Sequence, residues 1–182
     1  MRTLRYASLG FLLGVTWGVA ARVWMRLITT APEFSWSGTL IIIVGASIAG
    51  LALGVIHAAR RRGASQWWRL LGLLVVLFLS QAQGPLLLPA VLLGGWGLRR
   101  GALGRVVAGV GILSAPVLPL LLSWELVDTH LMPYPDTVYR LVLAAGGLLL
   151  SSTAAWASSI ALGPWRRGRT TLEPNEALAV AA

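Results

Sequence analysis

Two arginines near the end of the first apolar stretch are the residues most able to bind or pair with charge. Arg22 and Arg26 lie in the last third of an apolar run over residues 7–28. An arginine inside a hydrocarbon layer costs about 2.5–3.5 kcal/mol and usually faces a protein interior or a polar cavity. Helix side chains lean toward the N-terminus, here toward the middle of the layer, so reaching the headgroups is awkward. The pair predicts a buried ion-pair network, a site for an anion or lipid phosphate, or simple interfacial anchoring.

Carboxylates for these arginines are available in the loops on the same side of the predicted layer. Glu33 is the expected partner, because it follows Pro32 and a turn there can fold the loop back over the end of the run. Losing one partner of a buried pair costs about 3–5 kcal/mol. The candidate outer-face polar cluster comprises Arg22, Arg26, Glu33, Glu125, Asp128, Asp136 and Arg140.

Two glutamines mark a second polar position. Gln81 and Gln83 precede Gly84-Pro85, a pair that breaks a helix. If this turn lies at membrane depth, its amides must face protein or water and could line a solute cavity. Otherwise the segment is a turn at the outer surface.

Several chemistries are excluded or poorly supported. Cysteine is absent, so there is no disulfide, thiolate metal site or cysteine nucleophile. His130 with scattered carboxylates is a weak metal signal, and we predict no metal and no cofactor. Ser47 lies in a Gly-rich setting that superficially resembles an intramembrane serine protease, but His57 is on the same predicted helix and not on a facing one. No P-loop or HExxH motif is present, and we predict no catalytic residues.

The composition defines the class of protein. Hydrophobic residues make up 57% of the 182 residues and charged residues 12%, against about 25% charged in soluble domains. The net charge is +9 and every positive side chain is arginine. Nucleic-acid binding is not favoured, because no arginine cluster lies on a soluble domain. The sequence predicts a multi-pass membrane protein whose main partner is the lipid bilayer.

Four runs are long enough to cross a membrane: 7–28, 38–59, 102–123 and 137–162. The stretch 67–98 is too long for one span at about 48 Å, and Gly84-Pro85 divides it into two short segments. The prediction is an all-α polytopic bundle over 1–163 with six membrane segments, of which the third and fourth form a short hairpin, crossing or re-entrant. Residues 164–182 are predicted to be a disordered cytoplasmic tail. The first run continues to Ile28, which favours a retained helix over a cleaved signal peptide.

The arginines predict the orientation. A single crossing by 67–98 would place seven arginines inside and eight outside, whereas a hairpin places twelve inside and leaves Arg22, Arg26 and Arg140 outside. The positive-inside rule favours the hairpin, with both termini cytoplasmic in a plasma membrane. Aromatic residues sort into an inner belt (Tyr6, Trp67, Trp68, Trp96, Trp165) and an outer belt (Trp24, Phe34, Trp36, Trp124, Tyr134, Tyr139).

Small residues recur at four-residue spacing in three runs. Such rows allow helix backbones to approach closely inside a membrane. They serve either packing within the bundle or docking of a partner subunit. The rows are Gly10, Gly14 and Gly18; Ala46, Gly50, Gly54 and Ala58; and Gly147, Ser151, Ala155 and Ser159.

Two resemblances add expectations. The segment from Trp24 to Thr39 resembles one in small multi-pass membrane proteins of high-GC bacteria with no assigned activity. The overall plan is similar to the S-components of energy-coupling-factor vitamin transporters, which have six helices and dock a membrane partner through small residues on helix one. We therefore expect a non-enzymatic integral membrane protein. The alternatives are a solute-binding or transport subunit and an enzyme acting on a lipid-linked substrate at the outer face.

Overall fold

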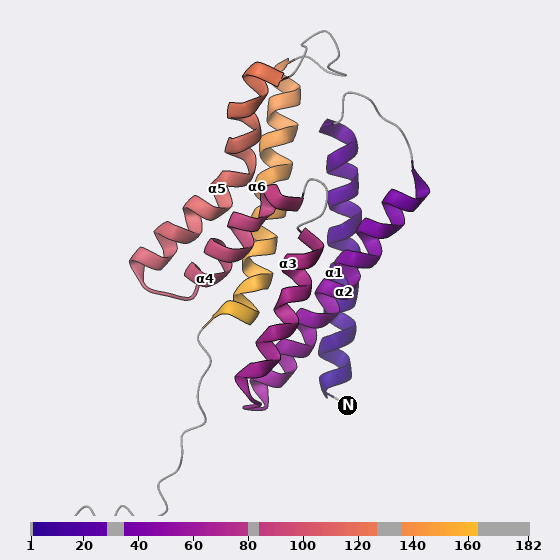
Figure 1. Cartoon of the computed structure of the whole chain (residues 1–182), viewed down its shortest axis with the longest axis vertical. Helices are drawn as coiled ribbons and strands as arrows, with labels where there is room; N and C mark the ends of the chain where they lie inside the picture. The colour runs from indigo at the N-terminus through magenta and orange to yellow at the C-terminus, as the bar shows by residue number, and fades with distance from the viewer. Residues whose placement is uncertain (1, 29–34, 80–83, 127–135, 164–182) are drawn as a thin grey trace, which may run out of the picture.

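The protein is an all-helical bundle throughout its described part. The computed structural model describes residues 2–28, 35–79, 84–126 and 136–163, and these contain helices and short turns but no strand (Figure 1). The elements in chain order are α1 (Arg2–Ile28), α2 (Trp36–Arg61), η1 (Gln66–Gly72), α3 (Leu73–Leu79), η2 (Gly84–Leu87), η3 (Ala90–Gly94), α4 (Gly95–Gly97), α5 (Ala102–Leu126) and α6 (Asp136–Leu162).

Three helices in this part of the chain are long and apolar enough to cross a membrane. They cover Thr3–Ile28, Trp36–Arg61 and Thr137–Leu162. Shorter apolar helices cover Gln66–Leu79, Pro85–Gly97 and Ala102–Leu118, the last being the portion of α5 whose side chains are described. These apolar helices agree with the composition, which indicates a helical protein associated with a membrane.

The ends of α2 follow from its flanking residues. Ser35 precedes the helix, and its hydroxyl accepts a hydrogen bond from the Gly38 backbone N–H at 3.2 Å. After Arg62, Gly63 adopts a φ of +69°, the left-handed conformation that ends many helices and that glycine adopts without strain. The chain then turns directly into η1.

The segment 66–97 consists of two short antiparallel pieces. η1 and α3 together extend about 25 Å, because a 3₁₀-helix rises about 2.0 Å per residue and an α-helix about 1.5 Å. This is less than the hydrocarbon core of about 30 Å. In Figure 1, α3 and α4 lie beside the lower half of the bundle and end well below the upper ends of α5 and α6.

Glycines bring α1 and α2 into backbone contact. A Cβ added to Gly10 would collide with the Gly50 carbonyl oxygen and lie 3.0 Å from the Gly54 Cα. A Cβ on Gly14 would collide with the Ala46 carbonyl oxygen, and one on Gly18 would lie 3.0 Å from the Ala46 Cβ. The two four-residue rows therefore pack against each other along this crossing.

α6 packs on α5 and on the short helices through its own small residues. Gly147 lies against Pro116, with a hypothetical Cβ 3.3 Å from the proline Cα. Ser151 is fully buried and donates to the Leu148 carbonyl oxygen. The buried Ser158 hydroxyl lies 2.9 Å from the Val91 carbonyl oxygen within η3, a π-helical turn. α5 bends in Figure 1, and Pro116 in this helix accounts for the bend.

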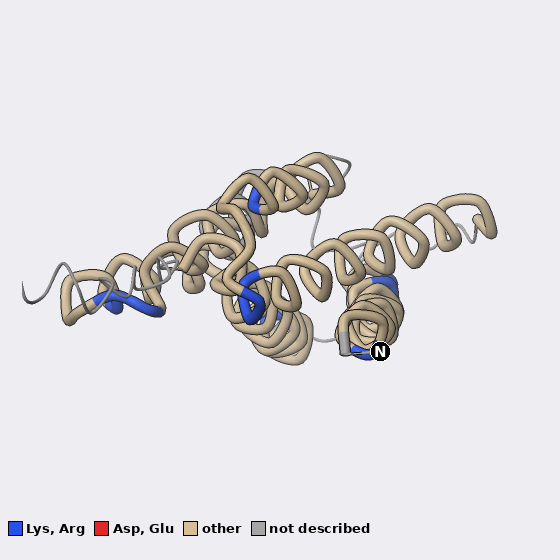
Figure 2. The backbone as a smooth tube through the Cα atoms, turned by 90° about the horizontal axis from the view of Figure 1, so that it is seen from below, with Lys and Arg blue, Asp and Glu red and all other residues tan. Residues whose placement is uncertain are grey.

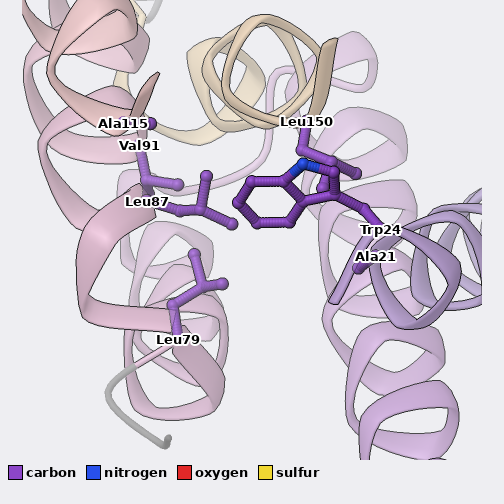
Figure 3. Close-up of a cluster of buried hydrophobic side chains, with 7 residues drawn as sticks. All are labelled: Ala21, Trp24, Leu79, Leu87, Val91, Ala115 and Leu150. Atoms are coloured by element: carbon purple, nitrogen blue, oxygen red, sulfur yellow. The ribbon is translucent and has the colours of Figure 1, made fainter. Parts of the chain in front are cut away.

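Trp24, which the belt pattern assigned to the outer interface, is buried inside the bundle. Trp24 is 7% exposed and packs in a cluster with Ala21, Leu79, Leu87, Val91, Ala115 and Leu150 (Figure 3). The indole N–H donates to the Val142 carbonyl oxygen at 3.2 Å. Tyr139, assigned to the same belt, is also buried and donates to the Ile28 carbonyl oxygen at 3.0 Å. Each of these two aromatic side chains forms a hydrogen bond between α1 and α6, because a buried N–H or O–H group needs an acceptor.

Candidate functional site

Arg22 is half-buried where α1 faces the first turn of α2. Its Nε donates to the Thr39 hydroxyl at 3.0 Å, and that hydroxyl donates to the Ser35 carbonyl oxygen at 2.9 Å. The described partner of Arg22 is therefore a hydroxyl group on α2. Arg26 is also half-buried, and Arg140 on α6 is exposed.

The side chains of the other members of the predicted outer-face polar cluster are not described in the structure. Glu33 and Asp128 fall in 29–34 and 127–135, and Gln81 and Gln83 fall in 80–83, all outside the described residues. Glu125 and Asp136 lie in α5 and α6, but their side chains are not described. The pairing of Arg22 and Arg26 with carboxylates and the glutamine-lined cavity remain predictions.

Three arginines, from α2, from η1 and from the turn after α4, converge on the end of α6. We call them the arginine cluster: Arg60, Arg69 and Arg99. Arg60 Nη1 donates to the Ile160 carbonyl oxygen at 3.2 Å. Arg69 Nη2 donates to the Gly163 carbonyl oxygen at 2.8 Å. Arg99 Nε donates to the Ser159 hydroxyl at 3.0 Å.

The geometry of Gly163 shows how closely these side chains approach one another. A Cβ added there would lie 2.8 Å from Arg99 Cδ and 3.2 Å from Arg60 Nη1. The last carbonyl groups of a helix lack intrahelical partners and carry the negative end of the helix dipole. Three cations at this position therefore stabilise the end of α6 and concentrate positive charge at one point.

This end of the bundle holds positive charge without negative charge in the described chain. Arg61, Arg62 and Arg100 lie beside the arginine cluster in sequence and are exposed. Figure 2 views the molecule from this end and shows arginines at the ends of several separate helices. The acidic residues within described helices are Glu125 and Asp136, and Asp136 begins α6 about 40 Å from the cluster.

An open, shallow apolar groove of about 420 Å³ lies on η1 and the first turn of α3. It is formed by two tryptophans and four leucines: Trp67, Trp68, Leu70, Leu71, Leu73 and Leu74. Trp67 is 73% exposed, so a flat aromatic surface remains available beside the leucines.

The spacing of residues in η1 indicates which of its sides faces α6, a feature that the length of the apolar run does not reveal. The residues absent from the groove between Trp67 and Leu74 are Arg69 and Gly72, and both face α6. A Cβ on Gly72 would lie 3.4 Å from the Ala161 Cβ. Arg69 and Gly72 are three residues apart, which matches the three residues per turn of a 3₁₀-helix. That period identifies which face of η1 binds α6 and which face remains open.

Comparisons of this chain with protein-family models, curated proteins and solved structures gave no match. The function must therefore be inferred from the chain's own residues and their arrangement.

Proposed function

We propose that the protein is a non-enzymatic, multi-pass protein of the plasma membrane that acts by binding. In this proposal six membrane segments leave both termini in the cytoplasm, and segments three and four form a re-entrant hairpin. The hairpin consists of two short pieces, 66–79 and 84–97. Their short extent supports re-entry, because neither piece reaches the thickness of a hydrocarbon core.

The observation that carries the binding role is the arginine cluster. Polar groups elsewhere in the described bundle serve its own packing: Ser47 donates to the Ile43 carbonyl oxygen, and the His57 ring packs on Tyr6 with centroids 5.0 Å apart. The arginine cluster also stabilises the end of α6, but it gathers three positive charges at one point, where they can attract an anion. A role in binding follows more directly from this feature than a role in catalysis.

A transport subunit that docks a partner through α1 is less well supported. The small residues that such docking would use, Gly10, Gly14 and Gly18, are covered by α2. An enzyme acting at the outer face would depend on loops outside the described residues.

Single cysteines test the proposed topology, since the native chain has none. Gln66→Cys and Gly101→Cys place labels on exposed positions on either side of the hairpin without removing an arginine. We expect a membrane-impermeant maleimide to label neither from outside intact cells and both after permeabilisation. Ser37→Cys, at the start of α2, is the control and should be labelled from outside. Labelling of Gly101→Cys but not Gln66→Cys from outside would mean that 67–98 crosses once, and the six-segment topology would be wrong.

A further inference from the structure

We propose that the turn between α4 and α5 binds the headgroup phosphate of an anionic phospholipid through Arg99 and Arg100. We call these two residues the arginine pair; Arg99 also belongs to the arginine cluster. The inference rests on the proposed function only in placing the chain in a bilayer, and it does not involve the groove on η1.

The backbone of this turn is held by contacts on both sides. The Leu98 N–H donates to the Gly94 carbonyl oxygen at 3.0 Å, and the Arg100 N–H donates to the Gly97 carbonyl oxygen at 3.0 Å. A Cβ added to Gly97 would collide with the Gly104 carbonyl oxygen, so α4 and α5 meet in backbone contact beside the turn. The arginine pair therefore extends from adjacent positions, about 3.8 Å apart at Cα, on a fixed backbone.

Each guanidinium group of the arginine pair is held by a contact that does not use its terminal nitrogens. Arg99 Nε donates to the Ser159 hydroxyl of α6 at 3.0 Å. Arg100 Cζ lies 4.0 Å from the centroid of the Trp96 ring, a cation–π contact that needs no N–H group. Both arginines are exposed, so a ligand can reach them. Because both side chains are ordered before a ligand arrives, binding costs less conformational entropy.

The chemistry of the arginine pair fits a phosphate ester with a net negative charge. A guanidinium presents a planar fork of N–H donors that matches phosphate oxygens. Arg105, in the first turns of α5, is also exposed and adds positive charge, whereas Glu125 lies at the other end of α5, about 35 Å away along the helix. A zwitterionic headgroup brings its own ammonium group, which these arginines repel. An anionic lipid is therefore preferred over a zwitterionic one.

The surroundings of the arginine pair favour a lipid over a soluble anion. Trp96, which contacts Arg100, is 39% exposed, and Leu103, the second residue of α5, is 78% exposed. Charge and exposed apolar surface therefore meet within about one helical turn. Tryptophan is enriched where acyl chains meet headgroups, and basic residues next to membrane helices attract anionic lipids. A dissolved phosphate would use the arginines and gain nothing from the apolar side chains.

Site-specific quenching tests the proposal on the full chain. Leu103→Cys carries a fluorophore beside the arginine pair. Leu4→Cys carries the same fluorophore as the control, because Leu4 is 73% exposed and adjoins a single exposed arginine, Arg5. Each labelled protein is reconstituted in phosphatidylcholine vesicles that contain a small fraction of spin-labelled phosphatidylglycerol or spin-labelled phosphatidylcholine. We expect phosphatidylglycerol to quench the Leu103→Cys probe at a severalfold lower mole fraction than phosphatidylcholine, with a clearly smaller preference at Leu4→Cys.

Matched charge variants of the Leu103→Cys protein identify the responsible arginines. Arg99→Gln/Arg100→Gln should lower the preference for phosphatidylglycerol at least about fivefold, since each basic residue near an anionic surface changes the affinity by about that factor. Arg61→Gln/Arg62→Gln removes the same charge from another adjacent and exposed pair, and it should retain most of the preference.

Neutral substitutions test whether the ordered side chains matter, and they suffice if the Arg99→Gln/Arg100→Gln variant does not fold. Ser159→Ala removes the hydroxyl that binds Arg99, and Trp96→Leu removes the ring that contacts Arg100, both without a change of charge. Each should lower the preference by about two- to tenfold, because one arginine side chain regains its freedom. Trp96→Phe keeps an aromatic ring and should retain most of the preference.

Four results would overturn the proposal. Equal preference at the Leu103→Cys and Leu4→Cys probes, or equal loss in the two double arginine variants, would show diffuse surface attraction. Full preference in both Ser159→Ala and Trp96→Leu would show that the ordered guanidinium groups do not select the lipid. Loss of the preference on adding excess glycerol phosphate would assign the arginine pair to a soluble anion. None of these results depends on which side of the membrane the turn faces, so cysteine labelling tests the topology separately.

Discussion

In the described part of the chain, four arginines donate side-chain hydrogen bonds from one element to another, and each binds an oxygen atom of a neighbouring segment. Arg22 binds the Thr39 hydroxyl, Arg60 and Arg69 bind carbonyl oxygens, and Arg99 binds the Ser159 hydroxyl. Lysine is absent from the chain. A guanidinium suits these positions because it is always charged, directs several N–H groups at once and is less strongly hydrated than an ammonium group.

A double-mutant cycle between Arg22 and Thr39 tests whether their contact stabilises the α1–α2 pair. We expect Arg22→Leu and Thr39→Val to show a coupling free energy of about 1 kcal/mol, typical of a hydrogen bond. Unfolding of the purified protein in mixed micelles gives the four free energies. Thr16→Val serves as the control, because the Thr16 hydroxyl donates to Leu12 within α1, and it should not couple to Arg22.

The same cycle distinguishes the hydroxyl contact from the ion pair expected with Glu33. If a carboxylate also binds Arg22, Arg22→Leu alone should cost about 3–5 kcal/mol, well above the coupling to Thr39. Zero coupling between Arg22 and Thr39 would contradict the contact described here.

At the scale of helices, backbone proximity replaces hydrophobic burial as the cause of association. Lipid chains are as apolar as leucine, so two membrane helices gain stability chiefly from close packing. α1 and α2 achieve this by placing Gly10 and Gly14 of one helix against Gly50 and Ala46 of the other. Carbonyl oxygens and Cα atoms fill the space that side chains occupy in other helix pairs.

Alanine substitutions separate close-packing glycines from incidental ones. Gly10→Ala and Gly50→Ala should each destabilise the protein by about 1–3 kcal/mol, because the added methyl group meets backbone that cannot rotate away. Gly109→Ala in α5 is the matched control, since no atom lies within 4 Å of the added Cβ. That change should be neutral or stabilise by up to about 1 kcal/mol through helix propensity. Thermal unfolding in detergent measures all three, and equal effects at the three positions would refute the packing model.

The sequence predicted the helices better than it predicted what their side chains contact. The run 137–162 corresponds to α6 and the run 38–59 to α2, because length and hydropathy are local properties. The inward direction of Trp24 was missed, because burial of one face depends on which helix packs there. Convergence of the arginine cluster also required knowledge that η1 and the end of α6 are neighbours, which only long-range packing decides.

At the scale of the whole molecule, many small residues of the described helices lie at helix contacts, and many bulky apolar residues are exposed on the outer surface. Gly50, Gly54, Gly147 and Ser151 all face neighbouring helices. Large side chains such as Leu13, Leu113, Leu141 and Leu149 are more than half exposed. A lipid-facing surface of this kind solvates well in acyl chains, and the close-packing faces that would recruit another helix are already occupied.

The protein should therefore be a monomer when extracted gently from its membrane. Native mass spectrometry of the full chain in a neutral detergent should give one copy of 19.4 kDa, together with species heavier by whole anionic phospholipids. Gly10→Ala should shift this distribution toward unfolded or self-associated protein, because opening the α1–α2 crossing exposes the faces that now pack internally. The exposed Leu149→Ala is the control and should leave the monomer unchanged. A stable dimer, or a pair of ATPase subunits that stays bound to the parent protein, would contradict a self-contained bundle and would favour a transport subunit instead.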